Sequence, residues 1–223
     1  MSDHLRTLAA RLPARHQQAL RRRRFARQIA RGTFASAEPE YDRLASWVVP
    51  GDWVLDVGAN VGHYTARLSA LVGIHGRVIA LEPVAENVEL LAANVVRLPL
   101  RNVTVLHAAA SSSGALVEVA VPRYAEGPRN FYRGSVTSDG SGDPTLAIPL
   151  DCLPIPHRVA FATIDVEGHE LAVLEGLQAL IDRDRPVLVV EGEEPAVAAF
   201  LERSGYSWSM AHRSPNRVFE PAG

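Results

Sequence analysis

From residue 41 onward, short apolar runs alternate with stretches whose apolar side chains recur at helical spacing. The apolar runs predict strands at 53–57, 77–81, 103–107, 160–164 and 187–190. The stretches that follow them predict helices at 63–71, 85–97, 170–181 and 196–204. Such regular alternation is typical of a doubly wound, mostly parallel sheet with helices on both faces.

Two segments depart from this alternation. Residues 115–121 alternate in the manner of an exposed strand, and residues 122–144 are rich in Gly, Ser, Pro and Arg. That composition predicts a long, mobile loop near the mouth of a binding site. Residues 206–211 and 217–219 predict a closing hairpin around Ser214-Pro-Asn216.

The N-terminal segment predicts a separate basic helical extension over residues 1–35, with the main domain at 36–223 and a break at Pro13. Residues 1–32 hold nine arginines and one acid, whereas the rest holds 14 arginines and 24 acids, and the chain has no lysine. The run Arg21–Arg24 fits an anionic partner, but a solvated helix face or a homodimer arm is its more common meaning.

Composition narrows the class of protein. Hydrophobic residues make up 47% of the chain, enough for a full core, and no apolar stretch reaches the length of a membrane span. The N-terminus lacks the apolar region of a secretory signal, and Cys152 is the single cysteine. We therefore expect a cytoplasmic protein with no integral membrane segment.

The loop Asp56-Val-Gly-Ala-Asn-Val-Gly62 joins the first predicted strand to its helix. Gly58 permits a sharp turn and a close ligand, at the strand end where open α/β sheets bind ligands. A dinucleotide site needs Gly-x-Gly-x-x-Gly, which this loop lacks. Asp56 would repel a diphosphate and attract a sulfonium or an amino group. The loop therefore favours a cationic nucleoside cofactor.

Two further features fit a nucleoside. Glu82 ends the second predicted strand and could accept ribose hydroxyls, although an acid before Pro83 also suits a helix start. Ala108–Ala110 follow the third strand. They could leave room for a flat adenine or simply pack the core, and the sequence favours neither.

A second cluster lies where the strand at 160–164 meets the next helix. Three carboxylates and an imidazole fall within Asp165–Glu170. Like charges this close repel, so the cluster indicates a task or a partner. The helix dipole accounts for Glu170, but it does not account for Asp165 at the strand tip.

These segments together resemble the FkbM family of methyltransferases. The matching motifs are Asp56-Val-Gly-Ala-Asn-Val-Gly-His-Tyr-Thr65, Leu81-Glu-Pro83 and Ile164-Asp-Val-Glu-Gly-His-Glu-Leu-Ala-Val-Leu-Glu-Gly176. The resemblance runs from about Glu38 to Glu191. It implies a Rossmann-like class I fold with seven strands and a reversed final hairpin. It also implies S-adenosylmethionine as cofactor and O-methylation of a sugar, polyketide or other small-molecule or glycan acceptor. Many relatives carry Lys where this chain has Thr163.

The resemblance implies site residues by position. The cofactor would contact Asp56, Gly58, Ala59, Asn60, Gly62, Tyr64, Thr65, Glu82, Pro83, Ala108, Ala109 and Asp165. The catalytic residues would be Asp165 near the methyl donor, with Glu167 and His169 facing the acceptor. His169 is the first candidate for general base because imidazole titrates near neutral pH, and Asp165 is the second.

Several alternatives stay open. Asp165, Glu167 and Glu191 could hold magnesium through carboxylate oxygens, although spacing alone does not show it. A dinucleotide oxidoreductase would lack its glycine motif here, and a cofactor-binding partner protein without catalysis is a further reading. Nucleic acid is not expected as a partner, because the part after residue 32 is acidic.

Overall fold

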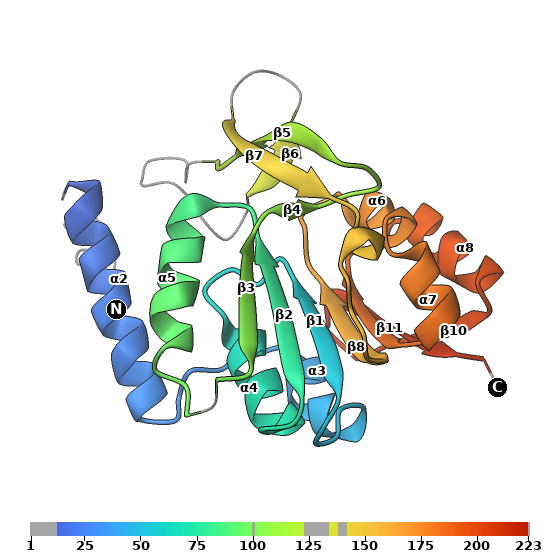
Figure 1. Ribbon diagram of the computed structural model, residues 1–223, viewed down its shortest axis with the longest axis horizontal. Coiled ribbons are helices and arrows are strands. Elements are labelled where there is room, and N and C mark those ends of the chain that lie inside the picture. The colour runs from blue at the N-terminus through green and yellow to red at the C-terminus, as the bar shows by residue number, and fades with distance from the viewer. Residues whose placement is uncertain (1–12, 100, 123–133, 138–141, 223) are drawn as a thin grey trace.

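The structure, a computed structural model, describes residues 13–99, 101–122, 134–137 and 142–222. Seven strands form a central sheet in the order β10-β11-β9-β8-β1-β2-β3 (Figure 1). Their bounds are β1 (Trp53–Val57), β2 (Arg77–Glu82), β3 (Val103–His107), β8 (Val159–Ile164), β9 (Val187–Glu191), β10 (Tyr206–Met210) and β11 (Asn216–Pro221). All pairings are parallel except those of β11, which runs opposite to both neighbours. This mixed sheet confirms the predicted fold class.

Helices cover both faces of the sheet. Successive strand residues point to opposite faces, so each face builds its own apolar core. Leu55, Ala162 and Leu188 belong to the core that includes α6 (Glu170–Glu175), α7 (Gln178–Asp184) and α8 (Pro195–Arg203). Val54, Phe161 and Val189 belong to the opposite core, with α3 (Pro39–Arg43), η1 (Leu44–Ser46) and α4 (His63–Val72). A further helix, α5 (Ala85–Val95), packs on β2 and β3.

A second, four-stranded sheet lies beyond the carboxyl ends of the central strands (Figure 1). It has the order β4-β7-β5-β6, with β4 (Ala109–Ala110), β5 (Ala115–Ala120), β6 (Ser135–Thr137) and β7 (Asp143–Ile148). The chain enters it directly from β3, and the Thr145 hydroxyl donates to the Pro83 carbonyl at 3.3 Å. The small sheet is therefore fixed over the end of β2.

The basic helix α2 (Ala14–Ala30) starts after Pro13, where the sequence predicts a break, and lies beside α5 (Figure 1). Phe25 is 3% exposed and packs with Phe34, Val61 and Leu90. Gln18 donates from its amide to the Glu86 carbonyl at 2.5 Å. The inner face of α2 is thus part of a core. Within the described residues, no helix combines the length and the hydropathy that crossing a bilayer requires.

Two predicted elements are wrong in part. The single helix predicted at 170–181 is two helices, because the chain turns at Gly176, the C-cap of α6. A Cβ there would lie 2.0 Å from the Ser111 carbonyl oxygen.

The loop predicted at 122–144 contains β6 and the first residues of β7. Both pair with β5, a partner distant in sequence that local composition does not reveal. The sequence of this loop also offers aromatic and arginine side chains that could contact an acceptor. They are Tyr124, Phe131, Tyr132, Arg123, Arg129 and Arg133, and all six lie outside the described residues.

We expect Gly176→Ala to lower the free energy of unfolding by about 2 to 3 kcal/mol, because the new methyl group overlaps the Ser111 carbonyl and the backbone of Pro149. Urea denaturation measures the change. The control is Gly114→Ala, where a Cβ meets nothing within 4 Å. Equal stabilities of the two variants would contradict the proposed contact.

Candidate functional site

Two loops meet where β1 and β8 end side by side. The Asp165 amide donates to the Val57 carbonyl at 3.0 Å. Gly58 has φ +83°, and a Cβ on it would lie 1.8 Å from the Asp165 carbonyl oxygen. Only glycine fits this position, because the backbone is left-handed and the second loop touches it directly. The crossing brings both sequence motifs to one edge of the sheet.

The glycine loop is also tied to β2 and to α5. The amides of Gly58 and Ala59 donate to the Leu81 carbonyl at 3.0 and 2.8 Å. Asn94, which is buried on α5, donates to the Val61 carbonyl at 2.9 Å. The loop is therefore shaped by hydrogen bonds from both sides before any ligand binds.

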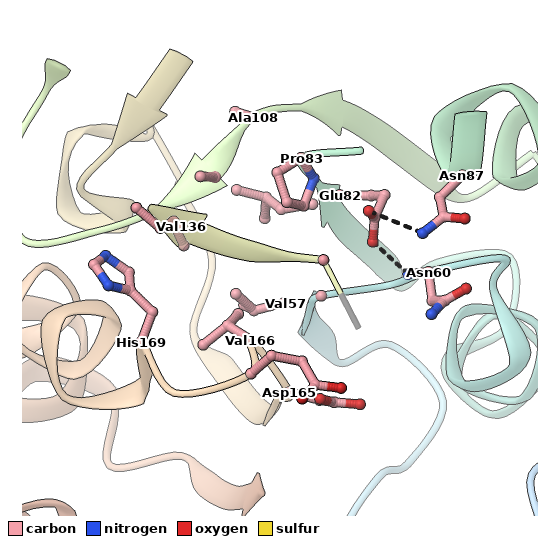
Figure 2. A pocket seen from close by; sticks show the side chains of 16 residues that line it. Val57, Asn60, Glu82, Pro83, Asn87, Ala108, Val136, Asp165, Val166 and His169 are labelled. Atoms are coloured by element: carbon pink, nitrogen blue, oxygen red, sulfur yellow. Dashed lines mark hydrogen bonds between the residues drawn. The ribbon is translucent and has the colours of Figure 1, made fainter. Parts of the chain in front are cut away.

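Glu82 stands at the end of β2 and is 4% exposed. Its carboxylate accepts from the Asn60 amide at 2.8 Å and from the Asn87 side chain at 3.2 Å (Figure 2). It also accepts from the Val84 amide at 2.9 Å. Burial raises the pKa of Glu82 to about 7, against the lowering effect of these three donors. A carboxylate offers about four acceptor positions, so one is left for a ligand hydroxyl.

Asp165, Glu167 and Glu191 form a carboxylate cluster. One oxygen of each lies within 4.8 Å of the others. Loss of water around the Asp165 carboxyl raises its pKa well above the usual range, and a hydrogen bond to Glu191 and the charges of Glu191 and Glu167 act in the same direction. Carboxylates this close repel one another, so the group as a whole favours a cation.

Glu38 extends this acidic region. It accepts from the Tyr64 hydroxyl at 2.5 Å and from the Asn216 side chain at 3.4 Å, and its charge also raises the pKa of Asp165. Asn216 donates to Glu40 as well, at 3.4 Å. Glu40 is fully buried, and its Oε1 finds no hydrogen-bond partner among the described residues. The acidic region thus runs from the cleft into the core.

His169 is the N-cap residue of α6 and is half-buried. Its Nε2 lies 3.0 Å from the Ser111 hydroxyl oxygen, within hydrogen-bond distance. The Ser111 amide donates to the Ile148 carbonyl of β7 at 2.9 Å. The imidazole is therefore held by the small sheet, and its other ring nitrogen, Nδ1, is not used in this contact.

These groups surround one open cleft of about 540 Å³. Figure 2 shows Glu82 and Asn60 on one side, Asp165 below, His169 at the far end and Val136 of the small sheet above. Apolar side chains, among them Leu81, Pro83 and Val166, line the rest.

The structure brings most of the predicted site residues together. Those that line the cleft are Gly58, Asn60, Glu82, Pro83, Ala108, Ala109, Asp165, Glu167 and His169. Five others do not line it, namely Asp56, Ala59, Gly62, Tyr64 and Thr65. Gly62 faces Leu91, and Asp56 is buried and accepts a hydrogen bond from the Thr65 hydroxyl. These residues support the loop on the side that faces away from the cleft.

Several lining or supporting residues are absent from the sequence prediction. The Asn87 side chain donates to Glu82, and the Ser111 hydroxyl lies within hydrogen-bond distance of His169. From the small sheet, Gly134 and Val136 line the cleft. A polar residue one helical turn after Pro83 is a weak signal for Asn87. The other three depend on the pairing of distant strands, which leaves no local pattern.

A family model described as the methyltransferase FkbM domain matches residues 56–207. The chain belongs to the FkbM methyltransferase family. Both motifs that cross at Gly58 and Asp165 lie inside the matched region, as does His169. No curated protein matches the chain.

Several solved structures of methyltransferases share the fold of this FkbM domain. Methyltransferase FkbM from Methylobacillus flagellatus KT has a TM-score of 0.56 at 17% identity, over 92% of this chain and 59% of its own length. An rRNA methylase from Streptococcus thermophilus has a TM-score of 0.52 at 13% identity, over 85% of this chain and 100% of its own length. A SAM-dependent methyltransferase from Aquifex aeolicus has a TM-score of 0.50 at 20% identity, over 82% of this chain and 89% of its own length. At these identities the likeness shows the fold alone.

Burial of Asp56 makes the stability of this FkbM domain depend on pH. Its pKa is raised from 3.8 to about 6, chiefly by burial, so the native state binds this proton more tightly than the unfolded chain. The resulting stabilisation is complete below about pH 4 and is lost as pH rises through 6. We compare the free energy of unfolding of wild type with that of Asp56→Asn, and expect the difference, wild type minus variant, to fall by about 2 to 2.5 kcal/mol between pH 4 and pH 7.5. Urea denaturation at a series of pH values measures it, and a constant difference would contradict the assignment.

Proposed function

We propose that this FkbM domain transfers a methyl group from S-adenosylmethionine to a hydroxyl oxygen of a sugar, polyketide or other small-molecule or glycan acceptor. One observation carries the proposal. The cleft places a carboxylate with an open acceptor position, Glu82, opposite a cluster of carboxylates that favours a cation. S-adenosylmethionine combines ribose hydroxyls with a positively charged sulfur and an amino group, so its two ends match the two sides.

The residues of the cleft fit this cofactor. Glu82 would hold a ribose hydroxyl, and the small side chains of Ala108 and Ala109 line the cleft nearby. Asp165 and Glu38 would lower the energy of the cationic end. Asn60 lines the cleft, and its buried Oδ1 has no hydrogen-bond partner among the described residues, which suits a ligand donor. When bound, the cofactor supplies a methyl group that is already activated for displacement.

On the acceptor side, this chain must align a hydroxyl and take its proton. Alignment contributes more to catalysis than proton removal does, since the methyl donor needs no activation. His169 is the best candidate for the base, because it stands at the far end of the cleft, whereas Asp165 lies among the carboxylates that would hold the cationic end of the cofactor. Ser111 fixes the imidazole through Nε2, which leaves Nδ1 to receive a proton from the acceptor hydroxyl.

Glu82→Gln should weaken binding of S-adenosylhomocysteine by about 10- to 100-fold, because a neutral amide replaces the charged acceptor of the ribose hydroxyl. Calorimetric titration of the purified protein measures the dissociation constant. Glu175→Gln, on the exposed surface of α6, is the matched control and should leave the constant unchanged. Equal affinities of the two variants would remove Glu82 from the cofactor site.

His169→Ala should lower kcat for methyl transfer by about 10²- to 10⁴-fold, with KM for the cofactor within about twofold, because only proton removal is lost. The assay uses methyl-labelled cofactor and cell extract separated into small-molecule, glycan and RNA fractions. His212→Ala, at an exposed position, is the control. Unchanged turnover in His169→Ala would exclude it as the base.

The same assay separates the alternatives. Cofactor binding without labelling of any fraction would favour a non-catalytic partner protein, and labelling confined to RNA would overturn the small-molecule acceptor. Asp165, Glu167 and Glu191 could also hold magnesium, since hard oxygen ligands suit it. Full activity in the presence of a chelator would assign the cluster to the cofactor alone.

A further inference from the structure

The outer face of α2 is a dense positive surface. Its exposed arginines are Arg15, Arg22, Arg23, Arg24, Arg27 and Arg31, the last at the C-cap. The helix contains no acidic residue. Together these six side chains define the arginine face.

The other side of α2 is already occupied. Phe25 is buried against Val61 and Leu90, and Ile29 packs on the same cluster. A helix that lies in a membrane surface needs its apolar face turned toward the lipid, and here that face is used inside the protein. Leu20, at 45% exposure, is the large apolar side chain that the described helix leaves open. The arginine face can therefore attract a partner by charge but has little to insert into a bilayer.

The spacing of the arginines suits a chain of phosphates. Arg23, Arg27 and Arg31 follow one another at intervals of four residues, so they form a row along one side with a rise of about 6 Å between neighbours. A guanidinium binds phosphate oxygens in a bidentate manner and stays charged at any physiological pH. The acidic part after residue 32 argues against a nucleic-acid partner, but it does not include this helix. We infer that the arginine face of α2 binds the sugar-phosphate backbone of nucleic acid without reading its sequence.

The acidic cleft does not cancel this attraction. Asp165 follows β8, whereas α2 packs on α5 beyond the β3 edge of the sheet (Figure 1). The exposed arginines lie away from the buried contacts of α2 with Val61 and Leu90, and salt screens exposed charges over about 10 Å at 0.1 M. Two oppositely charged regions can therefore act separately in a chain whose net charge is -2.

The test uses the full chain and a fluorescein-labelled, 20-nucleotide single-stranded RNA, followed by fluorescence anisotropy between 50 and 200 mM salt. Wild type should bind with an affinity that falls steeply as salt rises. Arg23→Gln/Arg27→Gln should weaken binding at 50 mM salt by about 10-fold or more and reduce the slope of log affinity against log salt by about 1.4, for two lost phosphate contacts.

The matched control removes two exposed arginines elsewhere, Arg203→Gln/Arg213→Gln, and should bind within about twofold of wild type. Equal weakening by both variants would overturn the inference, because net charge alone would then explain binding. The inference would also be overturned if neither wild type nor any variant bound RNA at 50 mM salt. Binding to vesicles with 30% phosphatidylserine but not to RNA would overturn it as well. Methyl transfer should be unchanged in both variants, so the result is independent of the proposed reaction.

Discussion

The contact between Gly58 and the Asp165 carbonyl is the constraint on which the site depends. It joins two loops that are more than 100 residues apart and fixes them at hydrogen-bond distance through the Asp165 amide and the Val57 carbonyl. The left-handed backbone at Gly58 and the absence of room for a Cβ make glycine necessary for two separate reasons. Because β1 and β8 are neighbours in the sheet, the contact also sets how far the Glu82 side of the cleft lies from the acids.

The acids near this contact are costly without a ligand. The charges of Glu191, Glu167 and Glu38 all raise the pKa of Asp165, and Glu40 and Asp56 are buried close by. A fold that needed only stability would gain by replacing such groups with neutral ones. The proposed cationic cofactor would offset this cost. The same region would then be a stability cost in the free protein and a source of affinity in the complex, a balance typical of binding sites.

The sequence predicts what depends on local pattern. Strand 103–107 and helix 63–71 follow from apolar spacing, and they appear with bounds equal or nearly equal to those of β3 and α4. Gly58, Glu82 and Asp165 are recognisable because each lies just beyond a buried strand. What the sequence does not predict comes from contacts between distant segments. The break at Gly176 depends on the Ser111 carbonyl, and β6 exists because β5 pairs with it.

The acceptor side is built almost entirely from such distant contacts. Ser111 meets α6 at both ends, since its hydroxyl reaches His169 and its carbonyl lies against Gly176. The imidazole is therefore positioned by the small sheet and not by α6 alone. Val136 and Gly134 of that sheet also face the cleft. It follows that changes in the small sheet alter two things together, the shape of the cleft beside Gly134 and Val136 and the orientation of the proposed base.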